Sequence, residues 1–389
     1  MTLEIATNFA HIAFVGLCLF CGQLLLLRRR DPGVYLPLAL LFLFMGSSSL
    51  IYLITATSGI TDRVGIAMRV SVMFELLKIA CPFLFWLYVQ RLTSEGLQER
   101  VPRLRSHLIA ILVVVMLTIP LMFLPPELND TELSEDHPAM ARLLLIALSV
   151  TVADFLFKIM IGVYLFLIFQ RLRVYRTRLR DIFSSTENRE MTWIWGITVA
   201  GVLFWLFGTA ISVGTWTDGF GLAENSDLFR FLESVFQLVL FWAIGIWGLR
   251  QRPGLTRDPV AEPEEPEASP IKKYEKSALD DERASRIARK IEAAMTDDLL
   301  YRNPNLSLWD LAKHIGVTSH YVSQTLNTML GSSFFDYINR WRIDDAIEQL
   351  TATDETILMI THDVGFNSRS AFYKAFKGQT GKTPSDFRK

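Results

Sequence analysis

The chain has 389 residues and a formal net charge of −1, so its overall charge gives no sign of nucleic-acid binding. Hydrophobic residues make up 51% of it and the mean hydropathy is +0.29, which is high for a soluble protein. The apolar excess lies before residue 250, whereas the residues after it have the composition of a soluble domain. The composition therefore excludes a uniformly soluble fold and indicates a chain of two parts.

Seven segments before residue 250 have about the 20 apolar residues that a helix needs to cross a bilayer. Their approximate boundaries are 7–27, 34–55, 66–90, 107–125, 143–169, 193–214 and 229–249. The first segment has no small-residue cleavage motif after it, so we interpret it as a retained span rather than a signal peptide. Residues 1–250 are thus predicted to form a seven-span bundle that contacts membrane lipid.

The loops indicate the orientation of this bundle. Those after the first, third, fifth and seventh segments are rich in arginine, whereas the alternate loops have almost no Lys or Arg and the loop over 126–140 is acidic. By the positive-inside rule, the N-terminus lies outside and residue 250 lies in the cytoplasm. An odd number of spans places the two ends of the bundle on opposite sides of the membrane, as the distribution of Lys and Arg requires.

The three cysteines lie inside the apolar runs, which argues against a disulfide-bonded secreted fold. Cys18 and Cys21 have CxxC spacing, but no second Cys or His pair accompanies them, so we interpret them as small apolar helix residues rather than as a metal or redox site. The chain has no Gly-rich phosphate loop and no Cys/His cluster. We therefore expect no catalytic residue, no metal site and no cofactor.

Charged residues inside membrane spans are costly and usually have a reason. Five of them lie on the third, fifth and seventh segments: Glu75, Lys78, Asp154, Lys158 and Glu233. Two pairs are three or four residues apart, so each charge can neutralise its neighbour on the same helix. Two interpretations stay open, namely polar contacts that fix helix packing, and a polar ligand pocket or protonation switch that senses a signal.

Residues 251–282 differ from the rest in being rich in proline and glutamate. Such a segment cannot bury enough apolar surface to fold, so we expect a disordered, extended linker. Residues 277–295 then form an amphipathic pattern, and this predicted helix is well placed to couple the two parts of the chain.

The C-terminal part, 283–389, contains residues that are typical of the starts and ends of short helices. Ser307 and Asp310 have capping-box spacing before a helix that stops at Gly316. Thr318 then caps a second helix, 321–330, which ends at Gly331. The same pattern recurs about 49 residues later, after a longer connecting helix over 334–350. A final short helix opens at Thr383 and Pro384, so two helix-turn-helix units are predicted.

This duplicated unit resembles the DNA-binding domain of the AraC/XylS family of bacterial transcription regulators. The residues that carry the resemblance are Leu308, Leu311, Ala312, Gly316, Val317, Gly331, Arg342, Gly365, Phe366, Asn367, Ser368, Ser370, Phe372, Phe376, Lys377, Gly381, Thr383, Pro384 and Arg388. One departure is Thr361, which stands where a small Ala is usual; its buried hydroxyl can bond to a carbonyl one turn earlier.

The resemblance implies that the second helix of each unit enters the DNA major groove. In the first unit this helix offers groups that can bond adenine but no Arg for guanine: Ser319, His320, Ser323, Gln324 and Asn327. In the second unit it offers both polar and cationic side chains: Asn367, Ser368, Arg369, Tyr373, Lys374 and Lys377. We expect the first unit to contribute more base discrimination and the second more affinity, because from residue 369 to 389 six cations accompany a single acid, Asp386.

The sequence therefore predicts an all-α chain: a seven-helix transmembrane bundle followed by a cytoplasmic, all-helical DNA-binding domain. The expected function is a multi-pass regulator in the bacterial inner membrane, not an enzyme, which binds double-stranded DNA as a homodimer in response to an external or lipid-borne signal. Two alternatives stay open: a membrane-anchored regulator activated by proteolytic release, and a multi-span receptor or enzyme with an accessory DNA-binding domain.

Overall fold

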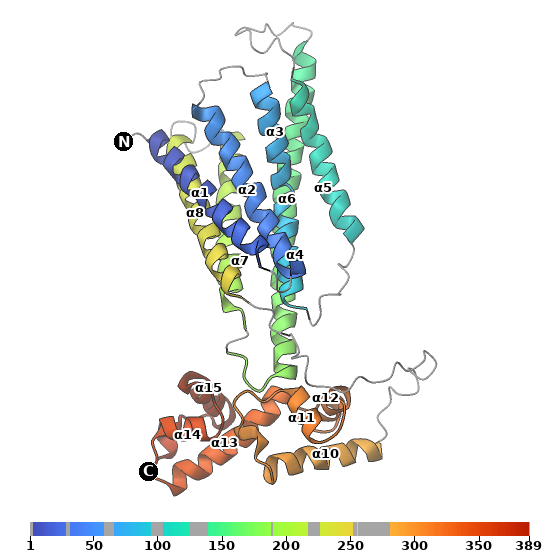
Figure 1. Cartoon of the computed structure of the whole chain (residues 1–389), viewed down its shortest axis with the longest axis vertical. Helices are drawn as coiled ribbons and strands as arrows, with labels where there is room; N and C mark the ends of the chain where they lie inside the picture. The colour runs from blue at the N-terminus through green and yellow to red at the C-terminus, as the bar shows by residue number, and fades with distance from the viewer. Residues whose placement is uncertain are drawn as a thin grey trace. The chain divides into compact units, whose positions relative to one another are not determined.

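The computed structural model describes residues 3–28, 32–57, 66–94, 104–124, 139–187, 190–216, 226–251, 255 and 281–388 (Figure 1). The chain divides into two compact units. The apolar unit comprises Met1–Leu172 and Thr192–Leu255, and the C-terminal unit comprises Arg173–Met191 and Thr256–Lys389. The regular elements among the described residues are all helical, as the sequence predicts.

The apolar unit contains α1 (Leu3–Leu26), α2 (Pro32–Thr57), α3 (Ile66–Lys78), α4 (Cys81–Leu92), α5 (Leu104–Thr118), the 3₁₀ turn η1 (Ile119–Phe123), α7 (Thr192–Trp216), α8 (Ser226–Arg250) and most of α6 (Ala139–Ile182). Seven helical stretches in the described residues are long and apolar enough to cross a membrane, in agreement with the predicted number. The third stretch, Arg69–Leu92, is divided at Ile79–Ala80 into α3 and α4, because Pro82 in the first turn of α4 cannot donate a backbone hydrogen bond.

Helix α1 packs against α2 and α8 in the apolar unit (Figure 1). Cys18 and Cys21 of α1 lie at close contacts with α2 and α8. A Cβ atom added at Gly46 of α2 would lie 2.7 Å from Cys18 Cβ, and one added at Gly245 of α8 would lie 2.7 Å from Cys21 Sγ. Both cysteines are buried, so they serve as small packing residues at helix contacts.

The loop predicted directly after the fifth span, 143–169, is wrong, because this sequence is helical. Helix α6 runs to Ile182, and its last ten residues belong to the C-terminal unit. The arginine-rich sequence after residue 169 is strongly polar, which led to a loop in the prediction, but Arg is a good helix former. The predicted linker, 251–282, lies almost entirely outside the described residues.

The other helices of the C-terminal unit are α10 (Asp281–Thr296), η4 (Leu300–Arg302), α11 (Leu308–His314), α12 (Ser319–Thr328), α13 (Phe334–Ala352), α14 (Ile357–Asp363), α15 (Arg369–Thr380) and α16 (Pro384–Phe387). Two hydrophobic cores form, one for each helix-turn-helix unit. The first half of α13 contributes Phe334 and Ile338 to one core, and its second half contributes Ile343 and Leu350 to the other. Helix α13 therefore joins the units.

Helix α10 covers most of the predicted coupling helix. Its residues Ile287, Ile291 and Met295 are buried in the first core. The amphipathic pattern thus reflects packing within the C-terminal unit, and its coupling role stays a prediction.

Candidate nucleic-acid interface

The turn of each helix-turn-helix unit contains a glycine with positive φ. Gly316, between α11 and α12, has φ +67°, and Gly365, between α14 and α15, has φ +95°. A Cβ atom at Gly365 would also lie 2.7 Å from the carbonyl oxygens of Tyr301 and Arg302. Glycine is therefore required at residue 365 both for its backbone conformation and for the close approach of η4.

Capping fixes where the short helices begin. The Ser307 hydroxyl accepts from the Asp310 amide at 3.2 Å, and the Ser307 amide donates to the Asp310 carboxylate at 3.0 Å, which completes the predicted capping box. At α16, the amide of Thr383 donates to Asp386 Oδ2 at 2.8 Å, with Pro384 at the first helical position. Helix α12 begins at Ser319, two residues before the predicted start.

The predicted base-reading residues of the first unit follow α12. His320 and Asn327 are exposed, and Ser319, Ser323 and Gln324 are partly buried. Spacings of four residues place these side chains along one side of the helix. The amide oxygen of Gln324 is buried, and it has no hydrogen-bond partner in the described part of the chain. A rotation of this side chain toward solvent would give that oxygen a partner, so base contact by Gln324 requires a change of rotamer.

The predicted cations of the second unit lie on α15. Arg369, Lys374 and Lys377 are exposed, whereas Tyr373 is partly buried. The Arg369 guanidinium donates to the Tyr373 hydroxyl at 3.0 Å and lies 4.9 Å from the centre of its ring. Hydrogen bonds with Ser385 and Arg369 hold the pKa of Tyr373 below its ordinary value. The exposed cations provide the positive face that phosphate contact needs.

Asn367 and Ser368, at the N-terminal end of α15, already have protein partners. Ser368 is the N-cap, and its hydroxyl accepts from the amide of Ala371 at 3.2 Å. The same hydroxyl donates to Glu187 Oε1 at 2.9 Å, and Asn367 Nδ2 donates to Ser185 Oγ at 3.0 Å. The sequence predicted both residues to contact DNA but gave no indication that residues 183–187 bind them.

Arg342 of α13 is fully buried between the two cores. Its three nitrogens donate five hydrogen bonds, to the Tyr301 carbonyl (2.7 Å), the Asn303 carbonyl (2.8 Å), Asn339 Oδ1 (3.3 Å), and the carbonyl and hydroxyl oxygens of Ser184 (3.2 and 3.1 Å). Burial lowers the pKa of Arg342 to about 9, which leaves it protonated at neutral pH. The resemblance identified Arg342 as a motif residue, but no sequence signal identified Ser184 as its partner.

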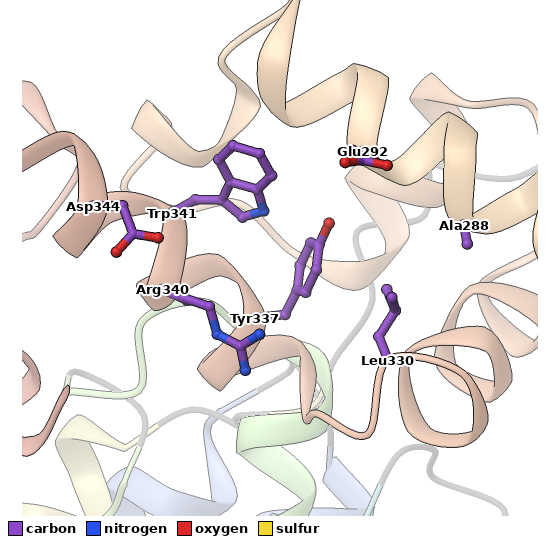
Figure 2. Close-up of a pocket in the computed structure, with 7 residues that line it drawn as sticks. All are labelled: Ala288, Glu292, Leu330, Tyr337, Arg340, Trp341 and Asp344. Carbon is purple, nitrogen blue, oxygen red and sulfur yellow. The ribbon is translucent and has the colours of Figure 1, made fainter.

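A separate shallow pocket of about 240 Å³ lies between α10 and α13, as Figure 2 shows, with the Tyr337 and Trp341 rings near its centre. Its remaining lining residues are Ala288, Glu292, Leu330, Arg340 and Asp344. This volume is below the roughly 300–1,000 Å³ of typical small-molecule sites. None of the predicted DNA-binding residues lines it.

Four of the five predicted charged residues of the apolar unit form ion pairs within their own helices. Lys78 Nζ lies 2.9 Å from Glu75, which also accepts from the Ser48 hydroxyl at 2.6 Å. Lys158 forms an ion pair with Asp154. Glu233 lies on α8. In the part of the chain that the structure describes, no group of three or more His, Cys, Asp or Glu residues could hold a metal ion.

Comparisons with known proteins give matches that each cover less than a third of the chain. A family model described as a helix-turn-helix domain matches residues 311–389. An uncharacterized HTH-type transcriptional regulator of Staphylococcus aureus (strain COL) is 33% identical over 112 residues, which cover 29% of this chain and 14% of the relative. A putative AraC-like transcription regulator of Streptomyces lividans is 37% identical over 93 residues, or 23% of this chain and 30% of the relative.

Among solved structures, the C-terminal domain of the two-component response regulator yesN from Fusobacterium nucleatum is similar, with 26% sequence identity and a TM-score of 0.23; the match covers 27% of this chain and 96% of that one. The chain spans less than a third of the length of either curated relative. Together with the two units described above, the family match shows that residues 311–389 form a helix-turn-helix domain of a kind found in AraC-type regulators.

Proposed function

We propose that the chain is a membrane-embedded transcription regulator of the AraC type, which binds specific DNA through α12 and α15 in response to an external or lipid-borne signal. One observation carries the proposal: two complete helix-turn-helix units, with exposed polar and cationic side chains, occur in one chain with helical stretches, seven among the described residues, that are long and apolar enough to cross a membrane. The names of the Staphylococcus and Streptomyces relatives support a role in transcription.

The arginine-rich loops support a cytoplasmic C-terminal unit, where it can reach the chromosome. Regulation through a homodimer is part of the proposal, because dimerisation would raise the local concentration of DNA-binding domains at paired half-sites.

The charged group on α3, α6 and α8 supports signal sensing within the bundle. Glu75 with Lys78, and Asp154 with Lys158, pair on their own helices, which also suits a packing role. Charges inside membrane spans are costly, so their occurrence on three helices supports a functional polar site.

Genome-wide occupancy tests the proposal. The full-length protein in its membrane is compared with a variant that combines Arg369→Ala, Lys374→Ala and Lys377→Ala. A control variant replaces three exposed cations outside the recognition helices, Arg286, Arg289 and Arg340, with Ala. We expect discrete occupied sites that are lost in the first variant and retained in the control. Absence of discrete sites, with the protein inserted and abundant, would contradict direct regulation from the membrane.

A further inference from the structure

Residues 183–187, here named the strap, follow α6 directly and lie within the C-terminal unit. Phe183 forms an isolated antiparallel β-bridge with Ser307, and the Ser184 amide donates to the Leu306 carbonyl at 3.1 Å. The Phe183 ring meets the Trp309 ring edge-on, with centroids 5.6 Å apart. The strap is therefore packed against the start of the first helix-turn-helix unit.

The first part of the strap is an anchor. Ser184 is 1% exposed and provides two of the five acceptors around buried Arg342. Withdrawing Ser184 would leave a buried guanidinium with unpaired N–H groups, which is unfavourable. Phe183 and Ser184 are therefore expected to stay bound whatever the state of the DNA.

The second part of the strap, residues 185–187, is here named the tip, and water can replace its contacts. Glu187 is exposed, and the bonds of Ser185 and Glu187 to Asn367 and Ser368 are also exposed to solvent. Solvent-exposed hydrogen bonds of this kind contribute little net stability, since water replaces them when they break.

The tip brings a carboxylate to the N-terminal end of α15, a 12-residue helix. A helix N-terminus carries a partial positive charge and unpaired N–H groups that favour anions, so it suits a DNA phosphate. The Glu187 carboxylate, held by the Ser368 hydroxyl, occupies the same end with the same sign of charge.

We propose that the strap is an autoinhibitory element: its docked tip excludes a DNA phosphate from the N-terminal end of α15, and DNA binds fully only when the tip has moved away. This inference rests on the proposed DNA-binding function.

Charge removal gives a first test on the full-length protein in lipid nanodiscs, with a mixed-sequence DNA duplex as the probe. Glu187→Gln is compared with Glu190→Gln, which removes the same charge from a residue that pairs with Arg176 and Thr186 instead of α15. We expect Glu187→Gln to tighten binding by about two- to fivefold and Glu190→Gln to leave it nearly unchanged. Equal effects of the two substitutions would attribute the change to net charge and overturn the inference.

Cross-linking gives the second test. The double variant Ser185→Cys with Asn367→Cys is joined by a short thiol-reactive cross-linker, and the untreated double variant is the control for the loss of the Asn367 amide. The three native cysteines are buried, so they compete little for the reagent. The joined protein is expected to bind about tenfold more weakly and to lose about one unit of salt-dependence slope.

Equal binding by the joined and untreated proteins would show that a docked strap is compatible with DNA, and it would overturn the autoinhibition alone. Failure of every variant and of the wild-type protein to bind the duplex at low salt would instead overturn the proposed function, and the inference with it.

Discussion

Arg342 is a charged residue buried between the two hydrophobic cores. The five oxygen atoms that accept hydrogen bonds from its guanidinium are all neutral. A buried charge without a counter-ion is tolerated only when its hydrogen bonds are complete, because each N–H group without a partner destabilises the folded state by its desolvation free energy. The stability of the C-terminal unit therefore depends on a residue more than 150 positions away in the chain, Ser184.

Ser184→Ala is expected to lower the free energy of unfolding of the C-terminal unit by about 2 kcal/mol, since it removes one hydrogen bond to a buried charge. Ser185→Ala, which loses only an exposed contact, is the control and should cost well under about 1 kcal/mol. Hydrogen exchange of the α13 amides in the full-length protein measures both effects. Equal protection in the two variants would show that water replaces the Ser184 hydroxyl.

The two recognition helices differ in chemistry, which separates specificity from affinity. Gln324→Ala is expected to change sequence preference, because an amide can bond adenine bidentately. Lys374→Ala should weaken binding to all sequences and lower the salt slope by about 1. Gel shifts with a panel of duplexes at two salt concentrations measure both effects. The opposite pattern would reverse the assignment of roles.

At the scale of elements, the glycine turns differ in how strictly they are required. Gly365→Ala combines positive φ with an overlap against two backbone carbonyls, so it is expected to cost more than about 3 kcal/mol and to unfold the second unit. Gly381→Ala has φ +74° but open space, and should cost only about 1–2 kcal/mol. Far-UV circular dichroism during thermal unfolding compares them. Equal losses of stability in the two variants would mean that η4 shifts to make room for the added Cβ atom at residue 365.

The sequence predicted helices that have strong local signals. The capping box at Ser307, the glycines at the turns and the apolar repeat between the two units are local patterns, and the structure confirms them. The Thr361 hydroxyl bonds to the Ile357 carbonyl at 2.6 Å, as expected for a buried threonine in a helix. The length of α6 and the position of the strap were not predictable, because their partners are distant in sequence and a polar helix gives no apolar period.

The predicted DNA-binding residues were likewise predictable only in the properties that local sequence patterns determine. Exposure of Arg369, Lys374 and Lys377 follows from the helical period. The engagement of Asn367 by Ser185 does not, because it joins residues 182 positions apart.

At the scale of the whole molecule, the distribution of arginine predicts an external N-terminus and a cytoplasmic C-terminal unit. Single cysteines provide the test: Asp130→Cys lies in the acidic sequence between the fourth and fifth predicted spans, and Asn305→Cys is exposed in the C-terminal unit. We expect an impermeant thiol reagent to label residue 130 in intact cells and residue 305 only after permeabilisation. The wild-type protein, with buried cysteines, is the unlabelled control. The reverse labelling would invert the topology.

The C-terminal unit is assembled from two separate stretches of chain, Arg173–Met191 and Thr256–Lys389. Three covalent junctions, after Leu172, Met191 and Leu255, join this unit to the apolar unit, and a protease that cuts within residues 251–282 breaks the chain near only the third of them. The Arg342–Ser184 bonds and the Phe183–Trp309 contact hold the cut pieces together. If the apolar unit lies in a membrane, as proposed, the nicked protein is therefore expected to sediment with that membrane, and liberation of the DNA-binding domain would require a second event, dissociation of the strap.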